Sequence, residues 1–186
     1  MSVEEFIAKA DEFAAGIGGG RFYKRSVLSI RKGAGVLEEV FGGGVYKHCL
    51  EIGTYRGVSA AFIATMCPRV TTVDLYRGRV EDTDGSERRR EFWEYMGVSS
   101  RITQILVNGD WEKQSKFADL DFDIAFIDGG KINVATDFNL VNRCGVVLFH
   151  DYDDRGRVDD YVFKFVNTLP RDEVTKMDIF ALWRRL

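Results

Sequence analysis

The sequence contains one stretch that indicates the architecture of the chain: His48-Cys49-Leu50-Glu51-Ile52-Gly53-Thr54-Tyr55-Arg56-Gly57-Val58-Ser59. An apolar run ending in an acid leads into a turn with two glycines, and small residues then begin a helix. A second apolar run ends in Asp74, 23 residues after Glu51. Glycines allow a close approach to a ligand, and an acid after the second strand can accept hydrogen bonds from ribose hydroxyls. The stretch therefore predicts a strand–turn–helix unit that binds a nucleoside.

The spacing of the glycines differs from that of the dinucleotide fingerprint, G-x-G-x-x-G. Here an acid is followed by Gly53 after one residue and by Gly57 after three more. A pyrophosphate needs several free N–H groups at a helix N-terminus. A ligand with a cationic centre and no phosphate tolerates a carboxylate such as Glu51. The alternative is an ordinary strand–turn–helix without a ligand.

The rest of the chain alternates between strand-like and helix-like segments from residue 47 onward. We expect strands at 47–52, 69–74, 101–107, 122–127 and 144–150, and helices at 57–66, 86–96, 112–118, 132–142 and 156–167. Such alternation gives right-handed βαβ units. Two further strand-like runs, 173–177 and 179–183, have no helix between them. The predicted fold is α/β, doubly wound and Rossmann-like, a mostly parallel sheet with one antiparallel edge strand at the C-terminus.

The first 45 residues are expected to be helical. Apolar residues at helical spacing predict a helix over 2–14, and a second helical stretch covers 26–41 after a glycine-rich break at 16–20. We expect one domain over 1–186, with 1–45 as a helical segment and 46–186 as the core. Residues 77–90 are the most irregular segment, and Arg88–Arg90 are expected on a solvated helix face.

Composition limits the partners. The 26 basic and 29 acidic residues give a net charge of −3, so no broad cationic face for nucleic acid is expected. No apolar run reaches the ~18 residues of a membrane span. The three cysteines lack metal-site spacing, which favours reduced thiols in a cytoplasmic protein. Little chain remains for a substrate cap, so either the acceptor is small, or residues 77–90 or a second subunit of a homo-oligomer completes the site.

A second group of polar residues follows two later strands. Asp128-Gly129-Gly130-Lys131 comes after the run 122–127, and His150-Asp151 stands at the end of the run 144–150. The carboxyl ends of parallel strands lie on one edge of a sheet, where ligands bind. We therefore expect these side chains on the same rim as Gly53 and Asp74.

With both motifs the chain resembles class I S-adenosylmethionine (SAM)-dependent methyltransferases. Over residues 46–186 it is similar to the small-molecule O-methyltransferases grouped with macrocin O-methyltransferase and the cephalosporin-hydroxylase-like proteins, which are related to catechol O-methyltransferase. The runs that carry this likeness are Phe126-Ile127-Asp128-Gly129 and Gly145–Asp153. The resemblance implies methyl transfer from SAM to a hydroxyl of a small-molecule acceptor.

The resemblance also implies roles for individual residues. The cofactor-binding candidates are Glu51, Gly53, Thr54, Gly57, Ser59, Asp74, Asp110 and Trp111. The candidate ligands of a divalent metal such as Mg²⁺ are Asp128, His150 and Asp151, and the candidate catalytic residues are Asp128 and Lys131, the latter as general base. Relatives read I-D-G-D-H where this chain has Gly130 and Lys131, which weakens the metal assignment more than the SAM assignment.

Several alternatives stay open at this point. Asp110 can also cap the helix that follows it, and Lys131 can be an exposed lysine at the start of a helix. A nonenzymatic SAM- or nucleoside-binding module would explain the loss of the acid at Gly130. An NAD- or nucleotide-dependent enzyme is the third reading. A nucleic-acid base methylase is disfavoured because the chain has no N/D-P-P-Y motif and is negatively charged.

Overall fold

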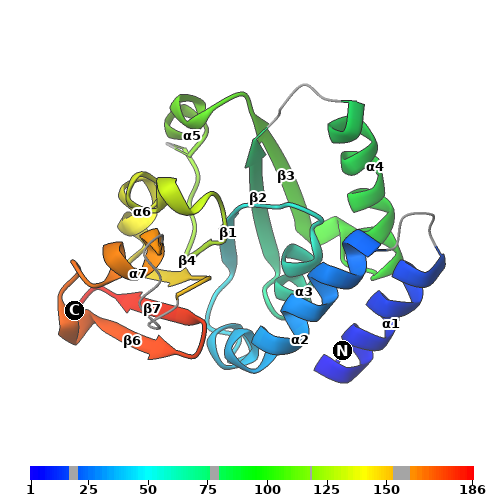
Figure 1. Cartoon of the computed structure of the whole chain (residues 1–186), viewed down its shortest axis with the longest axis horizontal. Coiled ribbons are helices and arrows are strands. Elements are labelled where there is room, and N and C mark those ends of the chain that lie inside the picture. The colour runs from blue at the N-terminus through cyan, green and yellow to red at the C-terminus, as the bar shows by residue number, and fades with distance from the viewer. Residues whose placement is uncertain (17–20, 76–79, 118, 153–159) are drawn as a thin grey trace.

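The computed structural model of the protein describes residues 1–16, 21–75, 80–117, 119–152 and 160–186. Its centre is a seven-stranded sheet in the order β3-β2-β1-β4-β5-β7-β6, with helices on both faces (Figure 1). The strands are β1 His48–Ile52, β2 Arg69–Leu75, β3 Ile102–Val107, β4 Ile124–Ile127, β5 Val146–Phe149, β6 Val174–Met177 and β7 Phe180–Arg184. The strands β1 to β5 pair in parallel, and β7 runs antiparallel to both of its neighbours.

The predicted fold class is confirmed, with one detail added. The antiparallel strand β7 lies one position in from the edge, and β6 is outermost. The two strands form a hairpin in which Met177 faces Phe180, and Asp178 in its turn has a φ of 55°. Aspartate tolerates this left-handed conformation better than most residues. The chain therefore passes beyond β5 to form β6 and returns to fill the gap with β7.

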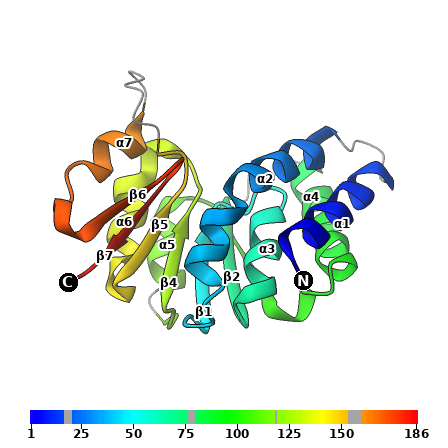
Figure 2. The same ribbon diagram turned by 90° about the horizontal axis from the view of Figure 1, so that it is seen from below.

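The helices divide between the two faces of the sheet, as Figure 2 shows from below. One side carries α1 Val3–Gly16, α2 Arg21–Phe41, α3 Val58–Met66 and α4 Val80–Tyr95; the other carries α5 Asp110–Phe117, α6 Val134–Val141 and α7 Tyr161–Val166. Short 3₁₀ turns are η1 Ser99–Arg101, η2 Lys131–Asn133, η3 Asn142–Cys144 and η4 Arg171–Glu173. Successive strand residues point to opposite faces, so Cys49 joins the α1–α4 cluster and Leu50 joins the other.

Two helices differ from the sequence-based expectation. Helix α2 begins at Arg21, five residues early, and α4 begins at Val80. The prediction of an irregular segment is therefore wrong for residues 80–90, where Glu and Arg, both good helix formers, offset the lack of an apolar period. The expected solvated face is also wrong at Arg89, which is 7% exposed. Residues 17–20, 77–79 and 156–159, which belong to the expected break, loop and last helix, lie outside the described part.

The register of the sheet sets the positions of the candidate residues. Glu51 lies opposite Thr72, Ile52 lies beside Ile127, and Ile127 lies beside Phe149. The residues that directly follow β1, β4 and β5 therefore converge at one edge. The carboxyl edge of such a sheet is where ligands bind in doubly wound folds.

Two further expectations can be compared with the structure. The three cysteines are free thiols; Cys49 and Cys67 are buried and Cys144 is partly exposed. Among the helices described, none combines the length and the apolar character that a membrane crossing requires.

Candidate active site

The glycine turn after β1 is shaped by contacts within the protein. Gly53 has a φ of 105°, and a Cβ there would come within 2.7 Å of the backbone nitrogen of Gly129. Gly57 has a φ of 73°, and a Cβ there would lie 2.7 Å from Nε1 of Trp93. The indole N–H donates a hydrogen bond to the Gly57 carbonyl at 2.8 Å. The absence of a side chain thus makes room for the β4 loop at Gly53 and for Trp93 at Gly57, and the expectation that these glycines also make room for a ligand stays a prediction.

Glu51 is completely buried on the face of the sheet covered by α3. The Thr72 hydroxyl donates a hydrogen bond to its Oε2, and the hydroxyls of Thr72 and Thr54 lie 2.7 Å apart. Burial raises the pKa of Glu51 to about 8, against the lowering effect of hydrogen bonds from Ser59 and Thr72. A carboxyl group removed from water resists ionisation because its charge loses hydration. Glu51 is therefore an internal acid beneath the turn.

Asp74 connects β2 to the same turn. Its carboxylate accepts hydrogen bonds from the backbone N–H groups of Tyr55 at 3.0 Å and Leu75 at 2.9 Å. Nη1 of Arg89 lies 3.6 Å from the same carboxylate and donates to the Tyr55 carbonyl at 2.6 Å. The Asp74 side chain remains 28% exposed. It can thus fix the turn and still offer lone pairs to a ligand.

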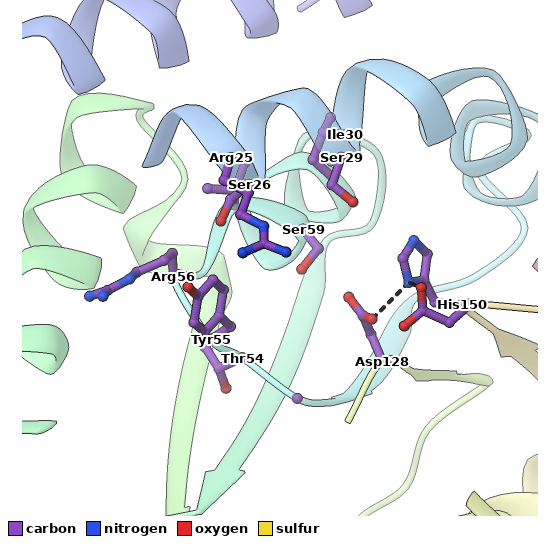
Figure 3. A pocket seen from close by; sticks show the side chains of 13 residues that line it. Arg25, Ser26, Ser29, Ile30, Thr54, Tyr55, Arg56, Ser59, Asp128 and His150 are labelled. Carbon is purple, nitrogen blue, oxygen red and sulfur yellow. Dashed lines mark ion pairs between the residues drawn. The ribbon is translucent and has the colours of Figure 1, made fainter. Parts of the chain in front are cut away.

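The turn borders a cavity of about 350 Å³ at the carboxyl edge of the sheet (Figure 3). Three groups of residues line it: Gly53, Thr54, Tyr55, Arg56, Val58 and Ser59 from the turn; Arg25, Ser26, Ser29 and Ile30 from α2; and Asp128, His150 and Asp151 from the ends of β4 and β5. Of the predicted cofactor residues, Gly53, Thr54 and Ser59 are on its wall. Glu51, Gly57 and Asp74 lie behind that wall or beside it.

The cluster of Asp128, His150 and Asp151 is formed as the sequence suggested. One ligand atom from each lies within 4.8 Å of the others. Nδ1 of His150 is 2.9 Å from Oδ1 of Asp128 and 3.4 Å from Oδ1 of Asp151, but its angle to either is too poor for a well-formed hydrogen bond. Asp151 has a φ of 61°, which turns its side chain back beside His150. Such a left-handed non-glycine residue is typical of functional sites.

The charges of this cluster depend on one another. Burial acts to lower the pKa of His150, but the carboxylates of Asp128 and Asp151 outweigh it and raise that pKa to about 10. The contact with His150 in turn lowers the pKa of Asp151 to about 2, with a smaller contribution from Lys131. The apo site thus holds a protonated imidazole between two carboxylates. A metal ion would have to displace that proton, since a ligating imidazole is neutral.

Lys131 lies outside the cavity wall. Its Nζ is 3.1 Å from Oδ2 of Asp151, and both side chains are about half exposed, at 51% and 41%. This is the salt-bridge arrangement expected of a lysine beside an anion. Asp110 and Trp111 begin α5, after β3, and their side chains are outside the described part of the structure.

The sequence analysis missed three features. The α2 residues that line the cavity form no sequence motif, because Arg25, Ser26 and Ser29 are ordinary residues of an amphipathic helix. Arg89 lies within the charged run 87–91, in which no local pattern distinguishes a buried arginine from an exposed one. Lys113 and Asp137 form a buried ion pair at 2.7 Å between α5 and α6. A lysine and an aspartate 24 residues apart carry no local signal of such a contact.

The sheet order and the position of the cavity define a class I SAM-dependent methyltransferase fold. A family profile described as a methyltransferase domain matches residues 50–152, more than half of the chain, and the chain belongs to that family. The predicted enzyme class, a SAM-dependent methyltransferase, is thereby confirmed and replaces the reading as an NAD- or nucleotide-dependent enzyme. Among curated proteins, no sequence matches the chain significantly.

Solved structures share the fold at low sequence identity. The O-methyltransferase TomG from Streptomyces achromogenes, involved in tomaymycin synthesis and solved with SAM, is 18% identical over 99% of this chain and 98% of that one, with a TM-score of 0.63. An O-methyltransferase from Bacillus cereus, in complex with S-adenosylhomocysteine (SAH), is 15% identical over 99% and 100%, with a TM-score of 0.60. The SAH-bound methyltransferase PaMTH1 from Podospora anserina is 14% identical over 97% and 88%, with a TM-score of 0.59.

Proposed function

We propose that this protein transfers the methyl group of SAM to a hydroxyl oxygen of a small molecule. One observation carries the proposal: Asp128, His150 and Asp151 converge on the wall of the same cavity that Gly53 and Ser59 of the glycine turn line. A methyl donor at the turn and a hydroxyl at the cluster would then be neighbours. The O-methyltransferase TomG, which has the same fold and was solved with SAM, supports this choice of chemistry.

The cofactor is proposed to lie along the turn and the ends of β1 to β3. The residues proposed to form its site are Glu51, Gly53, Thr54, Gly57, Ser59, Asp74, Asp110 and Trp111. Gly53, Thr54 and Ser59 would contact the end of SAM that carries the methyl group, since they line the cavity. Glu51 and Gly57 would contribute indirectly, by stabilising the conformation of the turn. The partly exposed carboxylate of Asp74 would accept hydrogen bonds from the ribose.

The cluster fits a divalent metal ion. Two carboxylates and an imidazole converge, and the His150 nitrogen lacks a well-aligned partner. Mg²⁺ prefers oxygen ligands, whereas imidazole suits transition ions. Mn²⁺ is a transition-metal ion that binds carboxylates and also accepts an imidazole nitrogen. It therefore matches this set of ligands better than Mg²⁺. When bound, such an ion would orient the acceptor hydroxyl and lower its pKa.

The reaction itself needs alignment and the removal of one proton. The acceptor oxygen forms a bond to the methyl carbon as the bond from that carbon to sulfur breaks; SAH is the leaving group, and the hydroxyl proton passes to a general base. Asp128, 30% exposed and facing the cavity, would hold the hydroxyl in line with the methyl group. Lys131 was predicted as the base; its pairing with Asp151 supports a role in holding that carboxylate, and its ammonium group would have to lose a proton before it could take up the hydroxyl proton.

The test combines binding and turnover. Chelator-treated protein is titrated with SAH by calorimetry, alone and with Mn²⁺ or Mg²⁺, and transfer of labelled methyl from SAM is measured on a panel of small hydroxyl compounds. Asp128→Asn should abolish turnover and metal binding, whereas Asp172→Asn, an exposed carboxylate outside the cavity wall, should change neither. Failure to bind SAH would contradict the proposal. SAH binding without transfer to any hydroxyl compound would favour the alternative, a nonenzymatic SAM-binding module.

Three expectations about partners and place stay predictions from the sequence. They are a cytoplasmic location, the absence of a nucleic-acid partner and assembly as a homo-oligomer. Helix α2 lines one side of the cavity proposed to hold the acceptor, and completion of the site by residues 77–90 or by a second subunit stays a prediction. A small acceptor is consistent with a cavity of about 350 Å³.

A further inference from the structure

The cavity wall formed by α2 carries a cation. Arg25 and Ser29 are four residues apart, so they lie on the same side of the helix. Both residues are exposed and lie away from the buried stripe of α2 that includes Val27, Ile30 and Ala34. Figure 3 shows the Arg25 side chain reaching from α2 into the cavity, with its guanidinium group beside Ser59. A charged group is thus presented to whatever occupies the cavity.

This guanidinium group has no partner in the described part of the chain, where no hydrogen bond or ion pair involves Arg25. The other arginine on the wall differs. In Figure 3 the Arg56 side chain points away from the cavity, and its guanidinium lies 5.3 Å from the centre of the Tyr55 ring. Arg25 is therefore the guanidinium on this wall that is available to a ligand.

Packing fixes the position of helix α2 relative to the cluster of Asp128, His150 and Asp151. Gly33 approaches Phe180 so closely that a Cβ would lie 2.7 Å from the ring. The Phe180 ring in turn contacts the imidazole of His150 edge to face, with centroids 4.9 Å apart. Since Phe180 is fully buried, this contact leaves α2 little freedom to move relative to His150. The position of Arg25 across the cavity is thus set by the core.

The cavity has the guanidinium group of Arg25 on one wall, and on the other it has carboxylates that already contact basic side chains. Arg25 lies on the α2 side and Asp128 at the end of β4 (Figure 3). Asp151, which also lines the cavity, follows β5. Asp128 and Asp151 are already in contact with His150 and Lys131, whereas the guanidinium group of Arg25 is left to attract an anionic group. A guanidinium matches a carboxylate well because it can donate two parallel hydrogen bonds. The arrangement favours a ligand that presents an anionic group to the α2 wall.

We propose that Arg25 binds a carboxylate group of a ligand in this cavity, with the Ser29 hydroxyl as a neighbouring donor. The inference rests on the proposed function, which supplies two sources of that carboxylate. One is the amino-acid end of SAM, and the other is an acidic acceptor. Either source places Arg25 in direct contact with a reactant and gives α2 a role in recognition.

The first arm of the test uses SAM and decarboxylated SAM, which differ by the carboxylate alone. Both are titrated into wild type, Arg25→Met, Arg25→Lys and the control Arg31→Met, an arginine on the same helix outside the cavity wall. If the cofactor is the source, Arg25→Met weakens SAM binding by about tenfold or more and leaves decarboxylated SAM within about twofold. Arg25→Lys should recover part of the loss, and Arg31→Met should show none.

The second arm addresses the acceptor. In the presence of SAH and Mn²⁺, 3,4-dihydroxybenzoate and catechol are compared, since they share the two hydroxyls and differ by a carboxylate. If the acceptor is the source, Arg25→Met weakens only 3,4-dihydroxybenzoate. Equal affinity of wild type and Arg25→Met for all four ligands would overturn the inference and leave the proposed function standing. A wild-type protein that fails to bind SAM would instead contradict the proposed function.

Discussion

Nη1 of Arg89 on α4 lies 3.6 Å from Oδ2 of Asp74 on β2. The same guanidinium donates to the carbonyl of Tyr55, whose N–H donates to Asp74. Arg89 thus connects a helix, a strand and the glycine turn. Because it is 7% exposed, this connection is well shielded from water.

Arg89→Met should loosen the glycine turn. We expect a loss of about 1–3 kcal/mol in the free energy of unfolding, because Asp74 and the Tyr55 carbonyl lose a charged donor. SAH affinity should fall as well. The measurements are urea denaturation and calorimetry, with the exposed neighbour Arg90→Met as control. Unchanged SAH affinity in Arg89→Met would show that this connection does not hold the cofactor site.

The buried acid Glu51 should make stability depend on pH. Its pKa is raised to about 8 in the folded protein, above that of an exposed glutamate, so the folded state holds a proton that the unfolded state releases. Its contribution is therefore complete at low pH, falls by about 1.4 kcal/mol per pH unit from about pH 4.5 to about pH 8, and levels off above that.

Glu51→Gln should remove this slope, because the amide does not titrate. The free energy of unfolding is measured by urea denaturation from pH 5 to 8.5, and the difference between wild type and variant isolates the contribution of Glu51. A difference that stays constant over this range would show that Glu51 is ionised in the folded protein at neutral pH.

Metal affinity should rise with pH. The pKa of His150 is raised to about 10, so its imidazole is protonated at neutral pH and must lose that proton to bind an ion. Mn²⁺ affinity should increase by up to about tenfold per pH unit between pH 6 and 8. His150→Asn should abolish the slope. A pH-independent affinity in the wild type would mean that the ion binds through the carboxylates alone.

Gly57→Ala should be far more costly than Gly97→Ala. Both glycines have a φ of 73°, but a Cβ at Gly97 meets open space, whereas one at Gly57 meets the indole of Trp93. We expect about 1 kcal/mol for Gly97→Ala from backbone strain alone, and about 2–4 kcal/mol for Gly57→Ala. Adding Trp93→Leu should cost less in the Gly57→Ala background than in the wild type. Equal effects of the two alanine variants would contradict the packing argument.

Lys131→Met tests whether this lysine is the base. Its exposed pairing with Asp151 predicts that turnover falls less than about tenfold and that SAH affinity is unchanged, since exposed ion pairs contribute little. Lys116→Met on α5, also exposed, controls for the loss of charge. Complete loss of turnover with intact SAH affinity would identify Lys131 as the general base.

Much of the fold could be predicted from local sequence patterns. Apolar runs alternating with helical periods gave the parallel strands, and the turn around Gly53 marked the first strand–helix unit. Asp128 and His150 could be assigned to one rim because each directly follows a buried strand, and strand ends in a parallel sheet share an edge. Helix α4 was harder to predict, because its charged first half has no apolar period.

The contacts between residues far apart in the sequence become visible only in the tertiary structure. Arg25 reaches the cavity because Gly33 lets α2 pack on Phe180, a contact between residues 147 positions apart. Gly57 and Trp93, and Arg89 and Asp74, meet in the same way across long separations. Periodicity reports which side of an element is buried, but not which distant residue it is buried against. The sequence by itself therefore determined the elements and the reactive edge, and long-range packing determined the walls and charges of the cavity.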